Sequence, residues 1–204
     1  MDISGIIEKV RALLNEVGSE ENLILLSEDT LKLDTYIQSV IPDAINTILA
    51  IVPLKYANIN NSTISAQITE DGTILNLPLD YCRFVAVKLN EWKREVQLIS
   101  PYGSDIYKIQ HNPITRSGKN KPCCVYANSL EGNVIECFPV GTLEYFKYVK
   151  NISTPVSDDE LKGINDELFP SICYMCASLV YSIFENPTTA DRMKQLSIEL
   201  MPKE

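Results

Sequence analysis

The sequence predicts an α+β fold in which N- and C-terminal helices form a helical layer around a small antiparallel β-sandwich or barrel-like sheet. Three observations support this prediction. Apolar residues recur at helical spacing in residues 1–52 and again in residues 157–204. Residues 53–156 instead hold short segments separated by turn residues, which is typical of antiparallel sheets. The 204 residues are expected to form a single structural domain, because a chain of this length can bury its own core.

The first helix is expected near the start of the chain. Six apolar residues between Ile6 and Val17 follow a helical period, and Gly18 is a stop signal. The segment 19–28 is expected to be a connector with a small apolar patch. This helix therefore presents one apolar face for packing.

A second, longer helix is expected next, with Asp29 or Thr30 as its N-cap. Its apolar stripe runs from Leu33 to Ile48. Pro42 lies inside this stripe. Because proline removes a backbone donor, the helix is expected to kink there or to split in two.

Short strands are expected throughout the middle of the chain. Apolar and polar residues alternate around Ile64, Ala66 and Ile68, which predicts a half-buried strand. The turn 70–72 leads to a return strand, so these two strands are expected to form a hairpin. The return strand is 73–77. Further segments that predict strands are 82–89 (a strand or a short helix), 94–99, 122–128, 133–138 and 143–149.

The last part of the chain returns to helical patterns. A helix start is expected at 157–160, and Pro170 fits the first turn of a long apolar helix. That helix is apolar over most of its circumference, so it should be buried among neighbours or lie at a subunit contact. Asn186-Pro187 should end it, and Thr188 or Thr189 should cap another helix.

The formal net charge of −9 is unevenly distributed. Residues 1–52 carry −6, residues 53–156 carry +2 and residues 157–204 carry −5. A protein that grips nucleic acid over a wide face normally needs a basic surplus, so this profile argues against such a protein. It leaves open a protein that surrounds DNA without holding it.

The sequence predicts a soluble protein made in a cytoplasm. The first residues carry Glu8, Lys9 and Arg11 where a signal peptide would have an unbroken apolar run. No stretch reaches about 18 uncharged apolar residues, so no membrane contact is expected. In a reducing cytosol the six cysteines are expected to remain free thiols.

The sequence offers little for metal or cofactor chemistry. Cys173-x-x-Cys176 lies inside an apolar helical pattern, and Cys123-Cys124 has the wrong spacing for tetrahedral zinc. Core packing is therefore the favoured interpretation of these cysteines. His111 is the only histidine and lies in a polar loop, where simple solvation is favoured over catalysis. No cofactor and no metal are expected.

Two further patterns are weak signals of catalysis. Gly118-Lys119 lacks the first glycine and the final Ser or Thr of a phosphate-binding loop. Asp158-Asp159 is better explained as a pair of helix-dipole partners at a helix N-terminus than as an acid/base pair. The protein is therefore not expected to be an enzyme.

One loop rich in Gly, Asn and Pro holds most of the basic surplus and is expected to be mobile. Its basic residues are Lys108, Arg116, Lys119 and Lys121. Two interpretations stay open. The loop could simply solubilise the protein, or it could contact an acidic surface on a neighbouring subunit or a passing phosphate.

Several segments carry a family resemblance. The run 75–96 contains Leu-Pro-Leu-Asp-Tyr-Cys-Arg, an apolar strand, Trp92 and then Arg94-Glu-Val. It resembles the β-hairpin region of phage head–tail adaptor (neck ring) proteins. With Tyr36–Asn46, Glu136–Phe146 and Ala190–Leu196, the chain is similar to ring proteins in the tail of crAss-like phages of gut Bacteroidales. Those proteins are similar in turn to the tail tubular adaptor of short-tailed phages.

The resemblance implies a virion structural protein of the head–tail connector, assembled in the host cytoplasm. It implies a homo-oligomeric ring, typically a dodecamer, that contacts the portal protein and neighbouring tail rings. Genomic DNA would pass through the lumen during ejection, with transient and non-specific contacts. The interface candidates are Trp92, Arg94, Lys108, His111, Arg116, Lys119 and Lys121.

A different class of function is the alternative. A non-viral binding module could use the basic loop to contact an acidic partner. Charge reversal of the loop would separate the two, because a module should lose its ligand whereas a ring subunit should mostly still fold and assemble.

Overall fold

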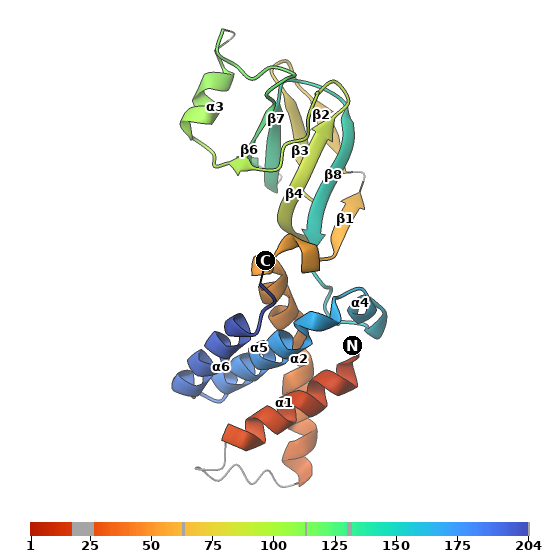
Figure 1. The fold of residues 1–204 in the computed structure, drawn as a ribbon, viewed down its shortest axis with the longest axis vertical. Helices are drawn as coiled ribbons and strands as arrows, with labels where there is room; N and C mark the ends of the chain where they lie inside the picture. The colour runs from red at the N-terminus through yellow and green to blue at the C-terminus, as the bar shows by residue number, and fades with distance from the viewer. Residues whose placement is uncertain (18–26, 63, 113, 130–131, 204) are drawn as a thin grey trace. The chain divides into compact units, whose positions relative to one another are not determined.

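The computed structural model describes residues 1–17, 27–62, 64–112, 114–129 and 132–203 (Figure 1). The chain divides into two compact units. The helical unit comprises Met1–Asn58 and Asn151–Glu204, and the β unit comprises Ile59–Lys150. The predicted α+β class, with helices at both termini and a central sheet region, is therefore confirmed. The single-domain expectation stays a prediction.

The helical unit is assembled around α5, which packs against α1, α2, α6 and η3. Helix α5 has the highest apolar content of these helices, and most of its residues are buried, as its sequence predicted. The helices are α1 (Ile3–Val17), α2 (Ser27–Ile51), α4 (Asp158–Lys162), α5 (Phe169–Ile183) and α6 (Pro187–Glu199), with short 3-10 turns η2 (Leu54–Tyr56) and η3 (Asp166–Leu168).

Helix α2 differs from its prediction in two ways. It begins at Ser27, so the expected N-caps Asp29 and Thr30 lie inside the helix. It also continues without a break past Pro42, so of the two expected alternatives, a kink or a split, the split does not occur. Proline costs the helix one hydrogen bond, whereas the apolar stripe on both sides of Pro42 is buried, and that burial outweighs the lost bond. Gly18 and most of the expected connector lie outside the described residues.

Proline and asparagine residues mark where the last two helices, α5 and α6, begin. Pro170 lies in the first turn of α5, as predicted. The N-cap of α6 is Asn186, whose side chain accepts a hydrogen bond from the Thr189 amide at 3.2 Å, so the expected Thr188 or Thr189 cap is wrong. Pro187 occupies the first helical position, where its missing N–H has no intrahelical partner to lose.

Three buried hydroxyls in the helical unit donate hydrogen bonds to backbone carbonyls of other helices. Ser178 donates to the Ala190 carbonyl and Ser197 donates to the Ser171 carbonyl, both at 2.7 Å. These two bonds join α5 to α6. Tyr181 of α5 donates to the Leu14 carbonyl of α1 at 3.2 Å. Because buried polar groups without partners are costly, these bonds make the helix packing specific.

The β unit contains two sheets that share one core. The strands are β1 (Ile59–Ser62), β2 (Ala66–Ile68), β3 (Thr73–Asn76), β4 (Tyr81–Leu89), β5 (Ile99–Ser100), β6 (Cys123–Ser129), β7 (Gly132–Phe138) and β8 (Leu143–Lys150). One sheet has the order β1-β8-β4 and the other β2-β3-β7-β6-β5. All pairs are antiparallel except β5 with β6. Side chains of both sheets meet in one cluster, which includes Leu75, Val87, Leu89, Trp92, Ile135, Phe146 and Tyr148.

Three expectations for this region need correction. The β2–β3 hairpin is confirmed, but β2 is exposed along its whole length, and Ile68 is 60% exposed. Strand β2 is an edge strand, so alternation alone did not reveal how little of it is covered. Residues 94–98 do not form a strand; the segment makes only an isolated bridge between Val96 and Val87. Lys108, expected to lie in the loop, belongs to helix α3 (Asp105–Gln110).

Candidate interaction surface

The basic segment of the sequence forms a folded projection from the β unit. We call residues 101–122 the α3 arm; residue 113 is outside the described residues. Its two ends meet at one place, because Ile99 and Ser100 of β5 pair with Cys124 and Val125 of β6. Figure 1 shows α3 standing beside β6 and β7. The arm is therefore anchored at the edge of the five-stranded sheet.

Hydrogen bonds fold the arm onto itself. Ser104 caps α3 by accepting from the Tyr107 amide at 3.3 Å. Gln110 is 1% exposed, donates to the Ile106 carbonyl at 2.7 Å and accepts from the Ser117 amide at 2.9 Å. The segment expected to be a loop thus begins within a short helix and continues in hydrogen-bonded turns. The sequence signal for it was the Ser-Asp helix start at Ser104.

A series of contacts between aromatic side chains connects the arm to β7. Tyr102 and Tyr107 lie 4.9 Å apart between ring centroids, and Tyr107 meets the His111 ring edge-on at 4.9 Å. His111 in turn meets Phe138 edge-on at 6.5 Å. Burial raises the pKa of the nearby Glu136 carboxyl, and His111 partly offsets this rise. His111 therefore has a packing position at the C-cap of α3, with an exposed outer side.

The predicted basic residues remain exposed, and one more joins them. Lys108 makes an ion pair with Asp105 at 3.1 Å. The side chains of Arg116, Lys119 and Lys121 are exposed on the turns that follow α3. The Lys93 amide donates to the Lys119 carbonyl at 3.0 Å, which brings a lysine from the β4–β5 connection to the arm. Sequence reasoning missed Lys93, although it directly follows Trp92 and precedes Arg94.

Trp92 and Arg94, the two interface candidates within residues 75–96, lie in different environments. Trp92 is 3% exposed, belongs to the shared core and donates its indole Nε1 to the Pro139 carbonyl at 3.0 Å. It stabilises the β unit and offers no open face to a partner. Arg94 is exposed and borders an open hollow of about 430 Å³. The other lining residues are Glu95, Val96, Gln97, Leu98 and Pro122.

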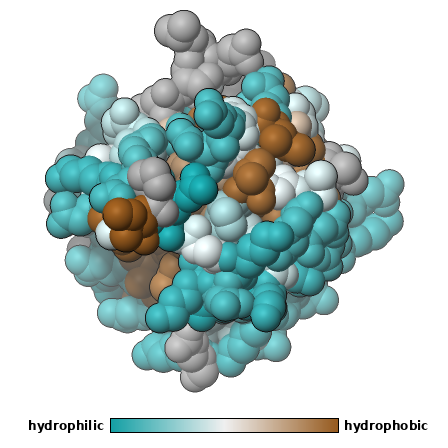
Figure 2. Space-filling model, turned by 90° about the horizontal axis from the view of Figure 1, so that it is seen from above, coloured by the Kyte–Doolittle hydropathy of each residue, from teal (hydrophilic) through white to brown (hydrophobic). Residues whose placement is uncertain are grey.

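Large apolar side chains accompany the basic ones. Ile114 on the arm is 93% exposed, and Leu98 beside the hollow is 86% exposed. Ile106 and Ile109 of α3 are also exposed. Figure 2 shows hydrophobic side chains in separate groups on a mostly hydrophilic face of the molecule. An exposed apolar patch with a polar rim is a feature of protein-binding surfaces.

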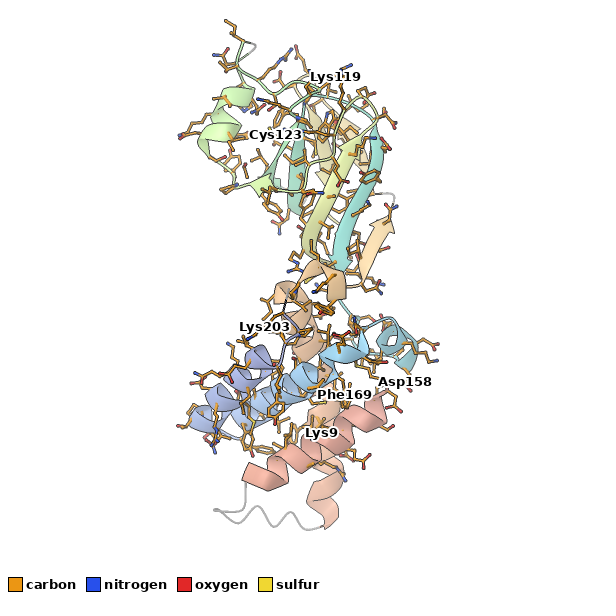
Figure 3. The ribbon with its side chains drawn as sticks, in the orientation of Figure 1. Lys9, Lys119, Cys123, Asp158, Phe169 and Lys203 are labelled. Carbon is orange, nitrogen blue, oxygen red and sulfur yellow. The ribbon has the colours of Figure 1, made fainter. Side chains whose placement is uncertain are left out.

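Figure 3 locates the arm within the β unit. Lys119 lies among the loops at the top of the view, and Cys123 lies at the start of β6 next to α3. We define the arm surface by its basic residues Lys93, Arg94, Arg116, Lys119 and Lys121 and its apolar residues Leu98, Ile106, Ile109 and Ile114.

The two units differ sharply in charge. The helical unit contains 18 acidic and eight basic residues, a net charge of −10. The β unit contains nine acidic and ten basic residues, a net charge of +1. Around the N-terminus of α1, Asp158 accepts from the Ile3 amide at 3.0 Å, and Asp166 pairs with the Met1 ammonium at 2.9 Å. Acidic side chains thus stabilise helix ends while giving the helical unit its negative field.

The cysteines in α5 are core residues, as predicted. Cys173 and Cys176 are both fully buried. Burial raises the pKa of Cys173 to about 12 and raises the pKa of Cys176 further above its ordinary value. Both thiols are therefore protonated near neutral pH and are poor nucleophiles.

The β unit carries a second hollow, beside the start of β4. It measures about 440 Å³ and is lined by Asn76, Leu77, Pro78, Leu79, Tyr81, Gly132, Asn133 and Val134. Burial raises the pKa of Tyr81, whose hydroxyl shares a 2.6 Å hydrogen bond with that of Tyr126. Among the described residues, this lining contains neither a carboxylate pair nor a nucleophile next to a base.

Comparison with known proteins adds no family assignment. Within the described residues, no group of three or more His, Cys, Asp or Glu side chains could hold a metal ion. No helix in the described ranges has both the length and the apolar content to cross a membrane. No protein-family model matches the sequence, and a comparison with curated proteins finds no match.

Proposed function

We propose that this chain is a virion structural protein that forms an oligomeric ring in the head–tail connector, joins the portal to the tail and lets DNA pass. The observation that carries the proposal is the charge difference between the units, −10 and +1, together with the exposed arm surface. A closed ring needs two different complementary faces on each subunit, since its contacts are head-to-tail. An acidic unit and a partly basic arm provide such a pair of faces.

The composition of the arm surface suits contacts between subunits. Long basic side chains steer association and set its specificity, whereas exposed isoleucines and leucines supply buried apolar area on contact. In the proposed ring, the arm of one copy contacts the helical unit of the next. The portal protein and neighbouring tail rings are the axial partners.

The acidic helical unit fits a conduit for DNA. A surface with excess negative charge repels phosphate, so DNA slides past without being held. The contacts with DNA in the proposed ring are accordingly transient and independent of base sequence. Tight binding of duplex DNA to the isolated chain would contradict this part of the proposal.

Assembly provides the main test. The protein is mixed with portal protein from the same genome, and products are followed by light scattering and negative-stain microscopy. We expect closed rings, formed alone or on the portal. A chain that stays monomeric at high concentration and never associates with portal would disprove the proposed function.

Charge reversal tests the role of the arm surface. We expect Lys119→Glu/Lys121→Glu to weaken ring assembly at low salt by roughly tenfold or more, because like charges would then face each other. The matched control is Arg192→Glu/Lys194→Glu on α6, which changes the net charge equally and lies in the other unit. Equal loss with both variants would show that total charge, and not the arm, controls assembly.

A binding module remains the alternative function, and the position of Lys93 beside Lys119 favours it. Such a module would use the basic residues of the arm surface to bind an acidic ligand. The arm variant would then abolish binding of an acidic peptide or short nucleic acid by a protein that stays monomeric. Ring formation with portal by the unaltered chain would exclude this alternative.

A further inference from the structure

Two cysteines face each other on the adjacent strands β6 and β7 of the five-stranded sheet. Cys124 of β6 is the direct partner of Cys137 of β7 in the strand register. Their Sγ atoms lie 3.2 Å apart, and both residues are fully buried. This pair has no part in the proposed ring contacts, so it stands independently of the proposed function.

The backbone geometry favours a bond between these two sulfurs. The Asn133 carbonyl of β7 accepts a hydrogen bond from the Leu77 amide, on the β3 side of β7. Backbone groups two and four residues further along a strand point the same way, so those of Cys137 also point toward β3. A Cβ added at Gly72, just before β3, would lie 2.7 Å from the Cys137 carbonyl oxygen, which agrees with this direction.

Cys124 and Cys137 therefore form a pair that is not hydrogen-bonded through the backbone. In such antiparallel pairs the Cα atoms are about 4.5 Å apart and the side chains are at their closest. Disulfides span Cα separations of about 4.4–6.8 Å. The strand positions thus allow a disulfide without a change of register.

The neighbouring thiol Cys123 is placed differently. It points to the opposite face of β6, because successive side chains alternate along a strand. It is half-buried and accepts a hydrogen bond from the Ser117 hydroxyl of the arm at 3.2 Å. Cys123 is paired in register with Phe138, so it has no cysteine directly across from it.

We propose that Cys124 and Cys137 are an oxidisable dithiol that a hydroperoxide converts to a disulfide across β6 and β7. One thiolate attacks hydrogen peroxide, the O–O bond breaks, a sulfenic acid forms, and the hydroxide that leaves takes up the proton lost by the thiol to give water. The second thiol then attacks the sulfenic sulfur, an S–S bond forms, and a second water leaves. Two thiols are oxidised and one hydroperoxide is reduced.

Burial controls the rate of this reaction. Burial and the neighbouring Cys137 thiol raise the pKa of Cys124, so the reactive thiolate is scarce at neutral pH. The oxidant also needs a transient opening of the sheet to reach either sulfur. The reaction should therefore be slower than oxidation of the half-buried Cys82 and Cys123, and it should be faster at higher pH.

The position of the pair gives the link a structural consequence. Ile99 of β5 pairs in register with Cys124, so the bond would form beside the strand that anchors the arm. It would join β6 and β7 covalently and reduce the conformational freedom of the unfolded chain. Oxidation should consequently raise the midpoint of thermal unfolding.

Peptide mapping tests the proposal. The native protein is treated with hydrogen peroxide, remaining thiols are alkylated in denaturant, and the chain is cut after glutamate. Cleavage after Glu131 and Glu136 places the two cysteines on different peptides. We expect a linked pair, two mass units lighter than the sum of its thiol forms, that reductant separates.

Two variants identify whether Cys124 or Cys123 forms the bond with Cys137. Cys123→Ser should retain the link in full, whereas Cys124→Ala should lose it. A link that persists in Cys124→Ala would identify Cys123 as the partner and overturn the proposal. Because the folded sheet shields both sulfurs from peroxide, the protein is also unfolded and then refolded in the presence of peroxide. Free Cys124 and Cys137 after both treatments would likewise disprove the proposal, whatever the outcome of ring assembly.

Discussion

The helical unit and the β unit bury their cores by different means. In the helical unit one apolar helix, α5, contacts four other elements, and buried serines tie it to α6. In the β unit two sheets close over a cluster of aromatic rings in which Phe146 and Tyr148 stack at 5.5 Å. Carboxylates are favourable near helix N-termini, which agrees with the larger number of acidic residues in the helical unit.

The units also differ in the side chains that they leave uncovered. The β unit exposes Leu98 and Ile114 almost completely, next to exposed lysines of the arm. The helical unit exposes apolar side chains to a lesser degree, for example Phe184, which contacts Tyr36 edge-on at 5.8 Å. The arm surface therefore offers a partner exposed apolar side chains together with exposed basic ones.

The largest expected effect is in the aromatic core of the β unit. Phe146→Ala should reduce the free energy of unfolding by about 3–5 kcal/mol, because it leaves a cavity among three rings. Denaturant titration measures the loss, and hydrogen exchange locates it. If protection falls equally in α5 and in β8, the two units unfold as one and the division between them has no energetic meaning.

A matched truncation probes the helical unit. Ile45 of α2 is fully buried, and Ile45→Ala should cost about 2–5 kcal/mol. Exchange protection should fall mainly in α2 and α5, which pack together. A loss confined to α2 would show that α5 is stable without its partner, contrary to its central position.

A smaller effect is expected at the start of α4. The Ser157 hydroxyl accepts from the Glu160 amide at 3.4 Å, and the Glu160 carboxylate accepts from the Ser157 amide at 3.3 Å. Ser157→Ala should therefore cost about 1 kcal/mol, which thermal unfolding measures. The control is Ser39→Ala inside α2, where the exposed hydroxyl donates to the Tyr36 carbonyl and caps no helix end. Equal losses in the two variants would show that the cap itself contributes nothing.

The same capping box should be sensitive to acid. Hydrogen bonds from Ser153 and Ser157 lower the pKa of Glu160 below its ordinary value of 4.5. A lowered folded-state pKa stabilises the fold above pH 4.5, and this contribution is lost as pH falls through the folded-state value. Glu160→Gln should flatten the acid side of the stability profile. An unchanged profile would mean that the carboxylate bonds contribute nothing measurable.

The smallest effect on stability is expected at the arm surface. Lys119→Glu/Lys121→Glu should change the free energy of unfolding by less than about 0.5 kcal/mol, since both side chains are exposed. Circular dichroism melts measure this. A large loss would mean that the arm residues support the fold, and assembly defects of the variant would then say nothing about an interface.

Local sequence patterns were sufficient to predict the secondary structure wherever one pattern dominated. Helical spacing predicted α1, α2, α5 and α6, and turn residues predicted the β2–β3 and β6–β7 hairpins. Pattern reasoning failed where the segment was short or the environment decided. Six residues are too few for a helical period to be recognised in α3, and β2 alternates like a buried strand although its side chains lie at an exposed sheet edge.

Which side chains are available to a partner depends instead on tertiary packing. Trp92 and Arg94 are two residues apart, yet one fills the core and the other borders a hollow. Lys93 reaches the arm through a backbone bond to Lys119, and Cys124 reaches Cys137 through strand register. Contacts of this kind depend on how distant segments pair, which local composition does not encode.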